Sequence, residues 1–290
     1  MRALDGAAVR PDQGRAPRTA PRHAPRQALR HPLRHAAIAA LFCSTAMLPA
    51  AARAALSDEI QVYTDDINDR GDFGLELHVN TTPKGRSTPD YPGEAVPHHG
   101  WRVTPEFSYG LGSGWEAGLY LPMNRDASGN TQLAGAKLRL KWLPVKPPDG
   151  EAGWFFGANG ELSRLKNRFS ESRTGFELRL MGGWRNPDWL FALNPVFGWN
   201  LSDGLRSGTA DLSLGVKVAR TVARDVALGL EYYADLGTTK RILPASQQAS
   251  VLYAAVDARV GGWDINFGVG RGLTKSADDL TVKAVVGVPF

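Results

Sequence analysis

The sequence predicts an all-β protein, a transmembrane antiparallel up-and-down β-barrel of twelve strands. Three observations support this fold class. From residue 72 onward, segments of about ten residues alternate between apolar and polar side chains, which is the period of a β-strand with two different faces. Many of the polar positions are charged, which suits a wet interior better than a packed core. All eight tryptophans lie near the ends of these segments.

The alternation defines each strand in turn. In one of the clearest segments, apolar residues at 138, 140 and 142 alternate with basic residues at 137, 139 and 141. The same period recurs along the rest of the chain. The expected strands span residues 73–80, 101–110, 114–122, 131–142, 153–164, 174–184, 189–199, 209–219, 225–236, 249–259, 263–271 and 279–289.

The last strand carries a second signal at its end. Counting back from Phe290 in steps of two gives an apolar stripe that includes Val288 and Val286. A terminal aromatic residue on the apolar face resembles the C-terminal signal of bacterial outer-membrane barrels. The resemblance implies that Val286, Val288 and Phe290 contact the barrel-assembly machinery and that the chain resides in the outer membrane of a Gram-negative bacterium.

An even strand number places both termini on the periplasmic side, so the gaps between strands alternate between the two ends. The gaps expected to be extracellular loops are 81–100, 123–130, 165–173, 200–208, 237–248 and 272–278. The other gaps are mostly short, as periplasmic turns are. The turn at 143–152 is longer than this rule predicts. The same topology puts six tryptophans and Phe290 at the periplasmic rim and Trp101 and Trp199 at the outer rim, forming aromatic girdles.

The N-terminal part has the pattern of an export signal. The net charge of the chain is +5, but residues 1–54 hold nine arginines and two aspartates, leaving 25 basic and 27 acidic residues in 55–290. A basic stretch precedes apolar residues 36–48, and Ala52-Arg53-Ala54 offers a cleavage site. We therefore expect residues 1–54 to be removed. The charge balance then gives no reason to expect nucleic-acid binding, and the loss of Cys43 excludes disulfides and thiol chemistry.

Residues 55–71 separate the leader from the first strand and can be interpreted in two ways. The segment is acidic, which suits a disordered periplasmic lead-in. Ile60, Val62 and Tyr63 instead suit a short segment held inside the lumen against basic wall residues. The sequence leaves both alternatives open, and the barrel itself is expected to span residues 72–290.

Strand parity predicts the residues that line the lumen. They are largely charged, and charged side chains facing lipid near the midplane would cost about 2–4 kcal/mol each. Basic residues gather on the fourth strand and acidic ones on the ninth to eleventh. The predicted pore-lining residues are Glu76, His78, Arg102, Glu106, Glu116, Lys137, Arg139, Lys141, Glu161, Glu177, Arg179, Asp211, Lys217, Glu231, Asp235, Asp257, Arg259, Asp264 and Lys283.

Three functions are compatible with such a lumen. The first is a narrow channel or diffusion porin whose transverse field orients polar or zwitterionic solutes. The second is a non-conducting barrel, closed by salt bridges, that serves membrane structure or surface interaction. The third is an outer-membrane lipid hydrolase, which needs a nucleophile beside a base. His78 has Asn80 two positions away and no His-x-Ser occurs after the leader, so we expect no catalysis.

The run Glu59-Ile60-Gln61-Val62-Tyr63, with Gly74-Leu75-Glu76-Leu77-His78 and a strand array ending in Phe290, resembles a proteobacterial family of small outer-membrane barrels. Its members are labelled as transporters and grouped with the MetA-type proteins of phenol degradation. The resemblance implies passage of small solutes, hydrophobic or aromatic compounds among them, without naming one. We expect outer-membrane lipids as partners, and either lipopolysaccharide or water around the basic loops at 165–173 and 237–248. No cofactor and no metal is expected.

Overall fold

The computed structural model describes residues 59–202, 204–206 and 208–288, which belong to the compact unit of residues 50–290. The predicted signal segment 1–54 and Phe290 lie outside the described residues. The strands are β1 (Phe73–Lys84), β2 (Trp101–Gly112), β3 (Trp115–Tyr120), β4 (Met123–Arg125), β5 (Thr131–Leu133), β6 (Gly135–Val145), β7 (Gly153–Leu165), β8 (Thr174–Arg185), β9 (Trp189–Asn200), β10 (Asp211–Ala223), β11 (Val226–Thr238), β12 (Arg241–Ile242), β13 (Ala249–Val260), β14 (Trp263–Gly272) and β15 (Leu280–Val288), with a 3-10 turn at Ala245–Gln247.

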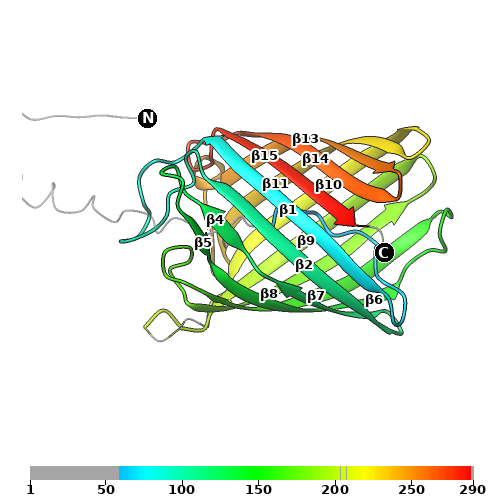
Figure 1. Cartoon of the computed structure of the whole chain (residues 1–290), viewed down its shortest axis with the longest axis horizontal. Helices are drawn as coiled ribbons and strands as arrows, with labels where there is room; N and C mark the ends of the chain where they lie inside the picture. Colours follow the sequence, from blue (N-terminus) through cyan, green and yellow to red (C-terminus); the bar gives the residue numbers. More distant parts are fainter. Residues whose placement is uncertain (1–58, 203, 207, 289–290) are drawn as a thin grey trace, which may run out of the picture. The chain divides into compact units, whose positions relative to one another are not determined.

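The strands form one closed antiparallel sheet (Figure 1). Apart from β3 to β6, and with the short β12 set aside, each strand pairs with the strands before and after it in the chain, and β1 closes the sheet by pairing with both β2 and β15. Two strands of the barrel are each interrupted once. The third is divided into β3 and β4, which both pair with β2. The fourth is divided into β5 and β6, where β5 pairs with β4 and β6 pairs with β3. The short β12 only extends β11 beyond the sheet. The barrel therefore has twelve strands, which confirms the prediction.

Prolines explain the interruption between β3 and β4. Pro122 separates these strands, and the ladder of β2 opposite it contains Pro105. Proline has no amide hydrogen to donate to a ladder. The chain still follows the barrel wall there, because Leu121 N donates to the Pro105 carbonyl at 3.1 Å and Ala134 N donates to the Pro122 carbonyl at 2.7 Å.

The two faces of the sheet differ as the period of two predicts. On β6, Leu138 and Leu140 are 60% and 47% exposed on the outside, whereas Lys137, Arg139 and Lys141 are buried inside. On β15, the buried positions are Thr281, Lys283 and Val285, and Val286 and Val288 belong to the partly exposed alternate set. An apolar outer surface around a charged interior is the arrangement of a transmembrane barrel. In the described part, no helix is long and apolar enough to cross a bilayer.

Loop lengths separate the two ends of the barrel. At the end where β1 begins and β15 ends, the connections are short, including Gly261–Gly262, where both residues have positive φ (58° and 87°) as a two-residue hairpin turn requires. At the other end lie the long connections 85–100, 166–173 and 273–279. β6 continues to Val145, so the turn expected at 143–152 shortens to 146–152. We call the two ends the periplasmic end and the outer end.

Aromatic side chains ring the periplasmic end. Trp115 stacks on Trp142 with ring centroids 5.5 Å apart, and Trp189 stacks on Phe191 at 5.8 Å. At the outer end, Trp199 stacks on Phe176 at 5.8 Å. These amphipathic rings lie near the ends of the strands, which is where aromatic girdles of a transmembrane barrel are expected.

Candidate functional site: the barrel lumen

Residues 59–71, named here the lumenal segment, run through the barrel toward the start of β1: most of them are buried or partly buried, whereas Asp66 and residues 69–71 are exposed. Ile60, Val62 and Tyr63 are only 9%, 4% and 4% exposed, although this stretch forms no regular secondary structure. Figure 1 shows its trace running within the ring of strands to the start of β1. The sequence left two interpretations of this acidic stretch open. In the part that the structure describes, the stretch enters the lumen.

Wall side chains from three strands hold the backbone of the lumenal segment. Asn194 on β9 makes two hydrogen bonds to Tyr63: its Oδ1 accepts from the backbone amide at 2.6 Å, and its Nδ2 donates to the carbonyl at 3.0 Å. Arg179 on β8 donates to the Gln61 carbonyl at 3.0 Å, and Lys283 on β15 donates to the Ile60 carbonyl at 2.9 Å. An irregular backbone inside a barrel needs such partners, because an unpaired buried polar group costs about 1–3 kcal/mol.

Side chains of the segment also pack against the wall. Val62 forms an apolar cluster with Phe155 and Ala192. Tyr63 packs against Leu143 and Met181, and its hydroxyl lies 2.7 Å from that of Tyr120. The Arg179 guanidinium lies 4.4 Å from the centre of the Tyr63 ring, a cation–π contact. The segment is thus bound to opposite parts of the wall.

The periplasmic half of the segment is held in the same manner. Asn68 N donates to Glu116 at 2.7 Å, and Asp65 forms an ion pair with Arg185 at 2.5 Å. Gly71 N donates to the Gly110 carbonyl at 2.9 Å, and Gly110 N donates to the Asp72 carbonyl at 3.0 Å. A Cβ atom at Gly110 would overlap the carbonyl oxygen of Asp69, so glycine permits this close approach. Every described contact of the segment with the wall is non-covalent.

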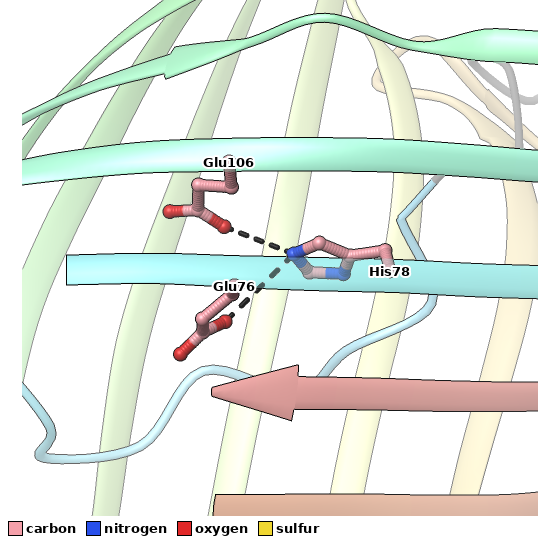
Figure 2. Close-up of side chains that lie close together, drawn as sticks. All are labelled: Glu76, His78 and Glu106. Atoms are coloured by element: carbon pink, nitrogen blue, oxygen red, sulfur yellow. Dashed lines mark hydrogen bonds and ion pairs between the residues drawn. The ribbon is translucent and has the colours of Figure 1, made fainter. Parts of the chain in front are cut away.

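Next to the segment, charged wall residues form a paired network on β1, β2, β3 and β6. Arg139 contacts both Glu106 (2.9 Å) and Glu116, and Lys141 lies 3.9 Å from Glu116. His78 Nε2 lies 3.0 Å from a Glu106 oxygen and 3.7 Å from a Glu76 oxygen. Figure 2 shows the three side chains with these two contacts as dashed lines. The network neutralises charges that the barrel has removed from bulk water.

Glu76, His78 and Glu106 are also the one group among the described residues whose donor atoms could surround a metal ion, since these atoms lie within 4.8 Å of one another. The surroundings favour an ion-pair network instead. The second oxygen of Glu106 is bound to Arg139. The Nδ1 atom of His78 is buried without a hydrogen-bond partner, whereas a metal-bound histidine usually donates through its other nitrogen. His78 Nε2 thus contacts two carboxylates, those of Glu106 and Glu76.

A second network surrounds Glu231 on β11. Its carboxylate contacts Lys283, accepts a hydrogen bond from the Tyr233 hydroxyl at 2.6 Å, and lies 3.3 Å from Lys217. Lys217 also pairs with Asp257 at 2.7 Å. Lys283 is fully buried, and its ammonium joins this network to the lumenal segment.

The predicted pore-lining residues separate into three groups. Arg259 and Asp264 are exposed at the periplasmic rim, where they pair with each other at 2.7 Å. Partly exposed inside the barrel are Glu76, Glu177, Arg179, Asp211, Asp235 and Asp257. Buried inside it are His78, Arg102, Glu106, Glu116, Lys137, Arg139, Lys141, Glu161, Lys217, Glu231 and Lys283.

The sequence analysis missed the polar and aromatic residues that hold the lumenal segment. Asn194, Tyr120 and Arg185 were not among the predicted residues, yet each contacts the segment. Asn194 has a signal that could have been used, because it is a polar residue between the apolar Leu193 and Pro195 at a position of inward parity. The parity rule finds the wall but does not show which wall residues face the segment.

Above the lumenal segment, at the outer end, lies a cavity of about 420 Å³, named here the vestibule. Glu59, Ile60 and Gln61 line its lower part, and loops 85–100, 166–173 and 273–279 contribute to its upper part. In the first of these loops, Arg86 holds Glu94 through two hydrogen bonds of 2.7 and 2.8 Å. Burial raises the pKa of Glu94, but the hydrogen bonds from Arg86 and from the Asp90 amide outweigh it, so the pKa lies below its usual value.

The fold has counterparts among solved structures. An outer-membrane channel from Pseudomonas putida F1 is similar over 80% of this chain and 100% of that chain, with 12% identity and a TM-score of 0.52. The fold is that of an outer-membrane β-barrel. The KdgM porin (12% identity, 75% of this chain and 99% of that chain, TM-score 0.47) and the NanC porin (14%, 74% and 98%, 0.45) are more distant in shape. No family model and no curated protein matches the sequence. The likeness concerns the fold alone, and the MetA-type resemblance stays a prediction.

Proposed function

We propose that this protein is an outer-membrane channel for small solutes and that the described conformation is its closed state. The observation that carries the proposal is a charged lumen that opens into a vestibule at the outer end and is crossed below it by the lumenal segment. A barrel that only anchors or stiffens a membrane needs neither a cavity nor a charged wall, because side chains can fill a small barrel.

Conduction requires the lumenal segment to move. Its contacts are hydrogen bonds, ion pairs and two small apolar clusters, each of which can be exchanged for water or for other wall residues. The segment is continuous with β1 at its C-terminal end. It can therefore leave the lumen by swinging about that end, or it can shift within the lumen. Either motion would connect the vestibule with the periplasmic end.

A reversible covalent tether tests this mechanism. A Cβ atom at Gly215 would lie 3.4 Å from Val62 Cγ2, which suits a disulfide between cysteines at these two positions. The chain after residue 55 contains no native cysteine, so Val62→Cys combined with Gly215→Cys creates a single pair. In planar bilayers, we expect discrete conductance from the reduced protein, silence after oxidation, and recovery with dithiothreitol. The two single variants serve as controls and should not respond to oxidation.

The competing function is a non-conducting barrel, and the crossing of the lumen by residues 59–71 favours it over an open porin. It predicts silence from the folded protein in both redox states. Conductance that the tether does not change would support a channel but refute gating by the lumenal segment. Binding of lipopolysaccharide by the basic outer loops stays a prediction; there Arg168 already pairs with Asp126 at 2.8 Å.

A further inference from the structure

The lumenal segment has two halves that different parts of the wall hold. In the half next to β1, Asp65 pairs with Arg185, and Gly71 is hydrogen-bonded to Gly110. The first half, residues 59–63, is held by side chains on β8, β9 and β15. Because the two sets of contacts share no wall residue, the first half can leave the wall while the second half stays in place.

The wall binds the first half through its backbone. Lys283 and Arg179 each donate to a carbonyl oxygen of this stretch, at 2.9 and 3.0 Å. Asn194 accepts from the amide of Tyr63 and donates to its carbonyl. Main-chain hydrogen bonds of this kind hold an extended peptide whatever its side chains are. The same three wall residues can therefore hold a peptide that is not part of this chain.

Two pockets of the wall receive side chains of the first half. Val62 packs against Phe155 and Ala192 in a small apolar pocket. Tyr63 occupies a second pocket, where its hydroxyl lies 2.7 Å from that of Tyr120. Pockets beside main-chain hydrogen bonds give a peptide site its specificity. This site suits a small aliphatic side chain followed by an aromatic one with a hydroxyl group.

The cations of this site keep carboxylate partners on the wall when the first half leaves. Arg179 lies 3.1 Å from Glu177, and the Lys283 ammonium contacts Glu231. The carboxylate that leaves is that of Glu59, which lies 3.7 Å from Arg179. A solute anion would have to compete with the carboxylates that stay. The site therefore favours neutral acceptors, such as peptide carbonyls, over a carboxylate or a phosphate.

The vestibule leads to this site. Ile60 and Gln61 are part of its lining, and so are Arg179 and Asn194. Its volume of about 420 Å³ lies in the range of pockets that hold small ligands. A solute in the vestibule thus lies next to the first contacts between the lumenal segment and the wall.

We infer that the wall of the lumen binds short extended peptides with a small aliphatic residue followed by an aromatic one. Residues 59–63 occupy this site as a built-in competitor. A peptide that enters through the vestibule replaces them, and their release opens the lumen. The inference names a solute class and a trigger for the channel, and in this respect it rests on the function proposed above.

Calorimetry on the folded protein in detergent tests the inference with the blocked peptide acetyl-Gln-Val-Tyr-amide. Tyr63→Ala empties the aromatic pocket and weakens the competitor, so it should bind the peptide at least tenfold more tightly than the unchanged protein. Val62→Ala should act in the same direction if Tyr63→Ala does not fold. Adding Asn194→Ala to either variant should weaken binding at least tenfold. Adding Asn159→Ala should not, because this equally buried asparagine forms no hydrogen bond to the described lumenal segment.

Two further probes test which groups the site recognises. The same peptide methylated on its tyrosine nitrogen lacks the hydrogen that Asn194 would accept, and it should bind at least tenfold more weakly. p-Cresol has the ring and the hydroxyl without a backbone, and it should also bind at least tenfold more weakly. The oxidised Val62→Cys and Gly215→Cys pair should not bind the peptide, because its segment cannot leave, and dithiothreitol should restore binding.

The inference would be overturned by an absence of peptide binding in Tyr63→Ala and Val62→Ala, or by equal affinities for the methylated and unmethylated peptides. Equal affinities for p-cresol and the peptide would show a site for free phenols and overturn the peptide class. In planar bilayers, the peptide should raise the open fraction of the unchanged protein. A protein that binds the peptide but stays silent would refute the channel alone. A protein that conducts without binding the peptide would refute the peptide site alone.

Discussion

Replacing Asn194 by alanine should loosen the lumenal segment by an amount that the contacts allow us to estimate. The Asn194 side chain is the partner of both the amide and the carbonyl of Tyr63. Its loss leaves two buried backbone groups unpaired, at about 1–3 kcal/mol each. Water that enters the space can hydrogen-bond to these groups and lower the cost, so we estimate that the docked segment is destabilised by about 2–4 kcal/mol in total. Because 1.4 kcal/mol corresponds to a factor of ten, the ratio of displaced to docked segment should rise roughly 30-fold to several hundred-fold.

Two readouts measure this shift. In planar bilayers, the open fraction of single channels should rise in Asn194→Ala. In detergent, a cysteine at the buried Val62 should react faster with a maleimide when Asn194 is replaced. Asn159→Ala is the matched control, because Asn159 is also 1% exposed but makes no hydrogen bond to the described lumenal segment. If Asn194→Ala and Asn159→Ala behave alike in both assays, the pairing of Asn194 with Tyr63 does not hold the closed state.

Three further predictions concern stability, close packing and pH. Glu231→Ala leaves the fully buried Lys283 without its carboxylate and should lower the free energy of unfolding in urea by about 3–5 kcal/mol. As the control, Asp264→Ala removes an exposed carboxylate and should lower the free energy of unfolding by no more than about 1 kcal/mol. Equal losses in the two variants would contradict the assignment of burial. Gly110→Ala should displace residues 68–72 and increase their hydrogen exchange, whereas Gly208→Ala, with open space around it, should not; an unchanged exchange rate in Gly110→Ala would contradict the close approach. The pKa of Glu94 is lowered in the folded protein. Its carboxylate therefore helps to order loop 85–100 at any pH above the ordinary glutamate pKa, and this contribution is lost as the pH falls through the lowered pKa. The Asp90 amide, which donates to Glu94, should then lose protection from hydrogen exchange, and constant protection down to the acid range would contradict this role.

The strands could be predicted because their determinants are local. A side chain on a strand faces the opposite side from its neighbour, so the order Lys137, Leu138, Arg139 already fixes which residues meet lipid. The gap between the strands expected at 249–259 and 263–271 also contains the observed turn Gly261–Gly262. The strand number followed from counting such segments, and the closure of the sheet through β1 and β15 agrees with it.

The candidate site depended on contacts that join distant parts of the chain. Asn194 and Tyr63 are 131 positions apart, and Lys283 and Ile60 are 223 apart. Parity places Lys137, Arg139 and Lys141 on the inner face, but it does not show which glutamates from other strands around the barrel they pair with. The expected basic row is in fact paired with Glu161, Glu106 and Glu116. The sequence alone thus determined the faces of the strands, since these follow from backbone geometry. Only the closed barrel decided which charges meet and what fills the lumen, since this depends on the curvature and register of the whole sheet.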